Sequence, residues 1–271
     1  MDGHHKNLAA ADVCGCNIVP TARDRLMPYQ AEYLEARQTL ALSARTAAGF
    51  IAQLGALAPI LIPPLPAATF GRRPGFQATV LDHKYWFAKL YEVVTYEELN
   101  YSIHTQHPGF SLHFMKVFYG MYYDSLQKFQ KRMRVVPLWQ THFVGPPTVH
   151  NRPVEPDSRD TVEYSVRTGA IAHIQGDMPV ALAAAYKTWV ATPKPGFQEL
   201  REDFINKSEV AFRRAQARFY VEVNDKICSP FRPEIGQFGA ASYQRLFDIQ
   251  PSLGVMFQWR RAAWQKAASS L

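Results

Sequence analysis

The chain has 271 residues, of which 47% are hydrophobic and 20% are charged. This composition excludes a disordered chain and allows one large domain, with or without an appendage. Thirty Lys and Arg residues against 23 Asp and Glu leave a formal charge of +7, which favours acidic partners but identifies none of them.

Residues 1–75 are expected to form an N-terminal segment with one long helix and a proline-rich connector. The helix is predicted over residues 27–57, because Pro28 suits a first turn and the interior is rich in Ala, Leu, Glu and Arg. Residues 46–71 carry no charge, but prolines interrupt them from Pro59 onward. A membrane span needs about 20 consecutive apolar residues, so no span is predicted.

The cysteines and the N-terminus indicate the compartment. Cys14, Cys16 and Cys228 make an odd count without metal-site spacing, which is typical of free thiols in a reducing environment. The first residues contain no uninterrupted apolar stretch after a basic start, as a signal peptide would. A soluble cytoplasmic protein is therefore expected.

Residues 76–271 are expected to form a helical core domain. Thr95 and Glu98 form a capping-box pattern that predicts a helix start at Thr95. A turn is predicted at residues 107–109, and Ser111 is expected to cap a central helix with aromatic residues on all sides. Pro137 opens a short helix, followed by a proline-rich loop over residues 145–158.

Four cations, Lys128, Lys131, Arg132 and Arg134, lie at the end of the central helix. The C-terminal end of a helix attracts positive charge through its dipole, so this run is interpreted as a helix end rather than a nucleic-acid site. No nucleic-acid partner is expected.

Residues 161–189 form the stretch around which a functional site is expected. His173 and Asp177 are four residues apart, so on a helix they project from one face. Gly176 and Pro179 weaken the helix beside them, and the missing N–H of Pro179 should free a carbonyl group at a kink. Local violations of helix rules often mark functional sites. The same pair also suits a buried structural hydrogen bond.

Two further helices are expected after a break at residues 192–196. One begins at Phe197 and runs to about residue 226, and the last covers residues 255–268. No sustained alternation of polar and apolar residues predicts a strand. The predicted fold is all-α, a single multi-helix bundle-like domain with long loops and an N-terminal helical appendage.

Several motifs resemble one family. They are Leu90-Tyr91-x-x-Val94-Thr95, Val136-Pro137-x-Trp139-x-x-x-Phe143, Ala172-His173-Ile174-x-x-Asp177-Met178-Pro179 and Arg261-x-x-Trp264-x-x-Ala267. Their order resembles the helical domain-of-unknown-function 5995 family of bacteria and fungi over residues 76–271, although Gln175 stands where that family has an Asn. The resemblance implies a helical fold and draws attention to His173 and Asp177, but it supplies no reaction. The His-x-x-Gly-Asp spacing is also similar to helices of zinc-dependent phospholipase C and single-strand nucleases.

The candidate site residues are therefore His173 and Asp177, as catalytic groups or metal ligands. A His nitrogen with a carboxylate oxygen suits a divalent metal such as zinc, iron or manganese, but needs further donors. His113 and Glu163 are the predicted additional ligands, with His104 and His107 as other candidates.

Three hypotheses for function follow. The first is metal-dependent hydrolysis of a phosphoester-like small molecule that is apolar or acidic. The second is a cofactor-free cyclase or isomerase, in which the His–Asp pair transfers a proton on an apolar biosynthetic intermediate. The third is a non-catalytic helical binding or scaffold protein. The sequence predicts no oligomeric state.

Overall fold

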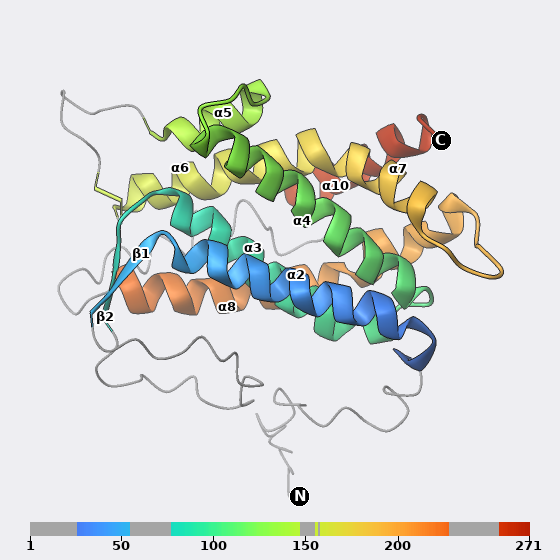
Figure 1. Cartoon of the computed structure of the whole chain (residues 1–271). Helices are drawn as coiled ribbons and strands as arrows, with labels where there is room; N and C mark the ends of the chain where they lie inside the picture. The colour runs from blue at the N-terminus through green and yellow to red at the C-terminus, as the bar shows by residue number, and fades with distance from the viewer. Residues whose placement is uncertain (1–25, 55–76, 147–154, 157, 228–254) are drawn as a thin grey trace, which may run out of the picture.

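The computed structural model describes residues 26–54, 77–146, 155–156, 158–227 and 255–271. These residues form a helical protein, as predicted (Figure 1). The α-helices are α2 (Gln30–Ala48), α3 (Lys84–Tyr101), α4 (Pro108–Gln130), α5 (Pro137–Val144), α6 (Arg159–Ala170), α7 (Met178–Thr188), α8 (Glu209–Ile227) and α10 (Val255–Ala268).

Shorter helical elements connect them. The described residues include the π-helices η4 (Ile171–Asp177) and η6 (Glu202–Lys207), together with the 3-10 turns η2 (Met27–Tyr29), η3 (Ser102–His104) and η5 (Phe197–Leu200). Strands β1 (Ile51–Leu54) and β2 (Gln77–Val80) pair antiparallel, with Ile51 opposite Val80. The sequence did not predict this two-stranded ribbon, which adds a small β element to the all-α fold.

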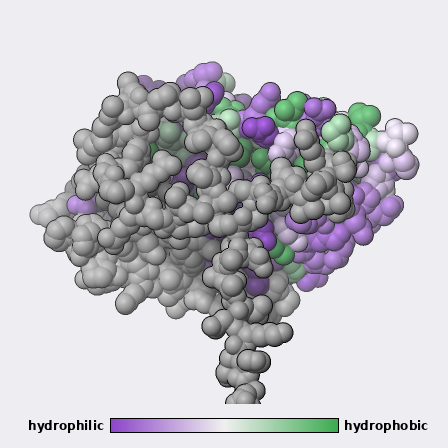
Figure 2. All heavy atoms as spheres, turned by 90° about the horizontal axis from the view of Figure 1, so that it is seen from below, coloured by the Kyte–Doolittle hydropathy of each residue, from purple (hydrophilic) through white to green (hydrophobic). Residues whose placement is uncertain are grey.

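The helices pack around a large aromatic core, with a smaller aliphatic cluster beside α2. Helix α3 contacts α2, α6 and α8, while α4 contacts α2 and α7, and α10 contacts α7. Helix α2 therefore packs directly on the helices of the predicted core domain (Figure 1). Trp86, Tyr122, Trp139 and Trp264 are among the largest side chains that are fully buried. Seen from below, the described surface is mostly hydrophilic, with scattered hydrophobic residues (Figure 2). None of the described helices is long and apolar enough to cross a membrane.

The helix predicted over residues 161–189 is continuous but not uniform. It runs as α6, then the π-helix η4, then α7. Pro179 lies just after η4, so its missing N–H falls where the backbone changes from the π-helical to the α-helical pattern. The N–H of Met178 donates to the carbonyl oxygen of His173, five residues earlier, which is the π-helical pattern. The irregular backbone therefore lies where the sequence predicted it, as a widened turn.

Three predicted boundaries in the first half are wrong. The first helix ends at Ala48 and gives way to β1, so it does not reach residue 57. Helix α3 continues through Thr95, whose buried hydroxyl donates to the carbonyl oxygen of Tyr91 instead of capping a new helix. Helix α4 begins at Pro108, so neither the predicted turn nor a cap at Ser111 forms.

A buried carboxylate explains the start of α4. The Asp203 side chain is 2% exposed, and its two oxygens accept the backbone N–H groups of Gln106 and His107 at 2.9 and 2.7 Å. These N–H groups have no partner within the helix, so a residue nearly a hundred positions away caps it. Sequence rules for capping consider only neighbouring residues and cannot find such a contact.

A second buried polar cluster connects η6, α8 and α10. Arg260 is 1% exposed and donates to Glu209 at 2.9 Å, to the carbonyl oxygen of Phe204 and to the hydroxyl of Ser208. Its guanidinium also lies over the Phe212 ring, 4.1 Å from the centroid. The fully buried cation is thus surrounded by acceptors and an aromatic face.

Several predicted features lie outside the described residues. These are the three cysteines, the proline-rich connector, the domain boundary near residue 75 and most of the loop over residues 145–158. The short helix from Pro137 and the last helix, Val255–Ala268, are confirmed.

Candidate functional site

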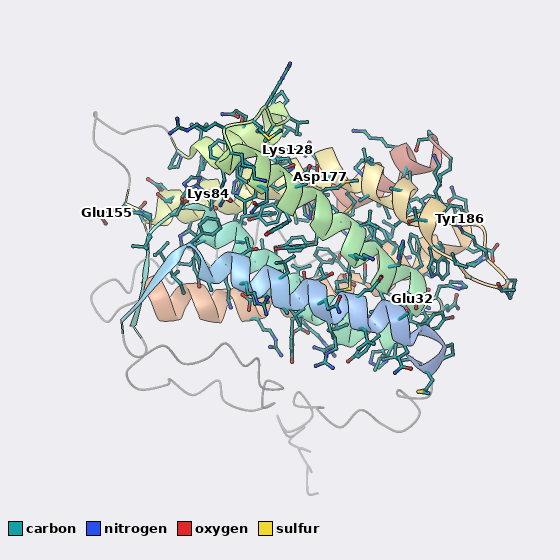
Figure 3. All side chains as sticks on the ribbon, viewed as in Figure 1. Glu32, Lys84, Lys128, Glu155, Asp177 and Tyr186 are labelled. Carbon is teal, nitrogen blue, oxygen red and sulfur yellow. The ribbon has the colours of Figure 1, made fainter. Side chains whose placement is uncertain are left out.

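His173 and Asp177 meet as predicted. Both belong to the π-helix η4, and Nδ1 of His173 lies 3.1 Å from Oδ2 of Asp177. The same oxygen accepts a hydrogen bond of 2.9 Å from the indole N–H of Trp139 in α5. Asp177, which is labelled in Figure 3, therefore joins the π-helix to α5 as well as holding the imidazole. Asp177 is 12% exposed, whereas His173 is 3% exposed.

The imidazole of His173 is enclosed by aromatic rings from three helices. It stacks on Phe118 of α4, with ring centroids 3.5 Å apart and an interplanar angle of 10°. Tyr91 of α3 meets it edge-on at 4.9 Å. Other rings with centroids within about 6 Å are those of Phe87, Tyr122 and Trp139. The ring therefore lies in the aromatic core.

Burial keeps this imidazole neutral. Removal from water lowers the pKa of His173 below its ordinary value of 6.5, and the hydrogen bond and negative charge of Asp177 oppose that shift only in part. With the N–H on Nδ1 directed at the carboxylate, the lone pair lies on Nε2. Nε2 is buried and has no hydrogen-bond partner among the described residues.

The other predicted metal ligands do not join the pair. His113 is on α4, and its Nε2 lies 2.9 Å from the hydroxyl oxygen of Thr188. Glu163 is a partly exposed residue of α6. Within the described ranges, no group of three or more His, Cys, Asp or Glu side chains is arranged to hold a metal ion. Two donors fall short of a metal site, and the shared oxygen of Asp177 already accepts two hydrogen bonds.

His104 and His107, the other candidate ligands, also lie apart from the His173–Asp177 pair. His104 is exposed and lies beside Tyr101, with ring centroids 5.1 Å apart. His107 precedes α4 and gives its backbone N–H to Asp203. Neither residue contributes to the surroundings of His173 described above.

Sequence reasoning missed the contribution of Trp139 and of a second buried histidine. A buried Trp usually donates its indole N–H to an acceptor. This rule could have indicated that Trp139 would donate to a nearby carboxylate. His142 is fully buried, with Nδ1 3.1 Å from the hydroxyl oxygen of Thr168 and Nε2 unpaired among the described residues. Burial lowers the pKa of His142 well below 6.5.

Comparison with known proteins assigns neither a family nor a function to the chain. No family model matches the chain, and neither the curated proteins nor the solved structures include a match. The resemblance to the domain-of-unknown-function 5995 family therefore stays a prediction.

Proposed function

We propose that the chain is a non-catalytic helical binding protein, in which His173 and Asp177 hold the core together. The burial of the His173 ring supports the non-catalytic part of this proposal. Only 3% of the side chain is exposed, and its faces and edges contact aromatic rings of α3, α4 and α5. A substrate would have to displace these rings before reaching the imidazole.

The bonding of Asp177 supports the same role. A single carboxylate oxygen accepts N–H groups from His173 and Trp139, which belong to different helical elements. A buried polar pair with this arrangement fixes how two elements pack. Metal-dependent hydrolysis receives no comparable support, since the described residues bring only two donors together.

A cofactor-free acid–base enzyme is the second candidate, and one observation favours it. Nε2 of His173 is a buried acceptor without a partner in the described part of the chain, while Asp177 fixes the tautomer. The residue lies in a π-helix, an element frequently found at functional sites. If the aromatic rings separate, this nitrogen is placed to remove a proton from an apolar substrate.

Chemical modification separates the two candidates. Diethyl pyrocarbonate acylates accessible neutral imidazole nitrogens, and peptide mass spectrometry reports the rate for each histidine. We expect His104, which is exposed, to react quickly and His173 to react at least about 100-fold more slowly, because reaction requires an opening of the core.

Equal reactivity of His173 and His104 in the folded protein would overturn the sealed-core proposal. Slow modification would support it, provided that His173 becomes reactive in urea. His104→Gln serves as the matched control, because it removes the fast site without touching the core.

A further inference from the structure

The segment from the end of α4 to the first turn of α5 presents cations and apolar side chains together at the surface. Met133, Val136 and Leu138 are 53%, 54% and 40% exposed. Lys131, Arg132 and Arg134, which flank Met133, are exposed as well. We call these six residues the basic-apolar loop. Figure 1 places this end of α4 and the neighbouring α5 at the top of the molecule.

Among the described residues, no acidic side chain pairs with the cations of this loop. Lys128, on the last turn of α4 and labelled in Figure 3, pairs with Asp124 at 2.6 Å. No ion pair within the described part of the chain involves Lys131, Arg132 or Arg134. Residues 125–154 contain no Asp or Glu at all. The loop is therefore a local source of positive potential.

The backbone holds these side chains in a defined arrangement. Arg132 has a φ of 57°, a left-handed conformation in which Gly or Asn is usual at a helix end. The N–H groups of Arg132 and Met133 donate to the carbonyl oxygens of Phe129 and Lys128 at 2.9 and 2.8 Å. A cation thus occupies a position where glycine would be less strained.

The far side of the loop is also fixed. Helix α5 starts at Pro137, and Trp139 is fully buried and bonded to Asp177. Leu138 lies over Gly176, since a Cβ atom added there would be 3.4 Å from its Cδ1. Leu138 is therefore presented by a helix that is anchored in the core through Trp139, and Val136 directly precedes that helix.

We propose that the basic-apolar loop binds the surface of an anionic membrane. The cations match acidic lipid headgroups, and the neighbouring apolar side chains suit the boundary between headgroups and acyl chains. A nucleic-acid surface would use the cations alone and leave Met133, Val136 and Leu138 in water. The inference rests on the proposed binding role, for which it names the partner.

Vesicle sedimentation with the full chain tests this inference. The probes are phosphatidylcholine vesicles with and without about 30 mol% phosphatidylserine. We expect binding only to the vesicles with phosphatidylserine, and we expect it to weaken strongly between about 0.1 and 1 M salt, where the Debye length falls from about 10 to 3 Å.

Two double variants identify the residues. Lys131→Glu with Arg134→Glu should weaken binding at least about 30-fold, because each cation near an anionic surface contributes roughly fivefold. Lys187→Glu with Lys266→Glu, on exposed parts of α7 and α10, changes the net charge equally and should retain binding. Met133→Ser with Val136→Ser should also weaken binding, whereas Val190→Ser, at an 83% exposed position, should not.

Three results would overturn the inference. They are absence of wild-type binding to the phosphatidylserine vesicles, an equal loss in the Lys187/Lys266 control, and unchanged binding by the Met133/Val136 variant. If the Met133/Val136 variant binds unchanged and the protein binds duplex DNA with equal affinity, the loop is a general binding surface for polyanions. The reactivity of His173 is measured without lipid, so failure here with His173 protected overturns the membrane inference alone.

Discussion

The imidazole of His173 lies face to face with the ring of Phe118, with centroids 3.5 Å apart and planes 10° from parallel. Helix α4 and the π-helix are thus joined through two flat rings, while Asp177 joins the same π-helix to α5. The neutral form of the imidazole suits this stack, because a charged ring would lose its hydration here.

His173→Ala is therefore expected to lower the free energy of unfolding by about 3–5 kcal/mol, as for removal of a large buried ring. His173→Phe keeps the ring contacts but takes one donor from Asp177, so a smaller loss of about 1–3 kcal/mol is expected. Urea denaturation measures both values. His113→Ala, at a half-buried position, is the control. A loss below about 0.5 kcal/mol for His173→Ala would contradict the structural role.

Stability should decrease as the pH falls below about 6.5. Burial lowers the pKa values of His83, His142 and His173 from 6.5 in the folded protein, so the unfolded chain binds more protons in this range. The three neutral histidines therefore make their full contribution to the free energy of unfolding above pH 6.5, and this contribution is lost as the pH falls. Denaturation curves from pH 7.5 to about 5 measure the slope. His142→Gln should flatten it, and an unchanged slope would remove His142 from this explanation.

Glu98 should have the opposite pH dependence. Burial of its carboxyl group raises the pKa from 4.5 to about 8, against the attraction of Arg260, even though part of the residue reaches the surface. Its stabilising contribution is present below pH 4.5 and is lost as the pH rises through about 8. Glu98→Gln should therefore be more stable than the wild type above pH 8 and similar near pH 4.5. A constant difference across this range would rule out titration as the cause.

The buried Arg260 predicts a large effect of a single substitution. Arg260→Met should reduce the free energy of unfolding by about 3–5 kcal/mol, because the partly buried Glu209 would keep only its longer contact to Arg213, at 3.6 Å. Arg261→Met, at the neighbouring partly exposed position, should change stability by less than about 1 kcal/mol. The double change with Glu209→Gln should recover part of the loss, and failure to recover would indicate that packing dominates.

Two glycines provide a matched pair. A Cβ atom at Gly169 would be 2.3 Å from Cγ of Phe87, whereas one at Gly120 would meet nothing within 4 Å. Gly169→Ala should cost about 1–3 kcal/mol through overpacking. Gly120→Ala, inside α4, should stabilise the protein by up to about 1 kcal/mol through helix propensity. Thermal unfolding of both variants measures these effects. Higher stability of both variants would show that the packing between α3 and α6 adjusts to an added methyl group.

The sequence predicted the helical fold because hydrophobic spacing and helix-forming residues agree over most of the described chain. It also placed the His173–Asp177 pair, since residues four apart on a helix are neighbours. It could not place Asp203 at the start of α4 or Trp139 on Asp177, because both contacts join residues far apart in the sequence. Local patterns likewise misjudged Thr95, whose hydroxyl bonds within an uninterrupted helix.

The widened turn η4 also affects how the two halves of the long helix relate to each other. A π-type turn accommodates one more residue than an α-helical turn, which offsets the apolar stripe after it by about 100° relative to the stripe before it. A homologue with an ordinary helix at this point would align with the chain only across a one-residue gap between Ile171 and Asp177. Deleting the exposed Gln175 would remove that offset and rotate Ala181 and Leu182 away from the interior.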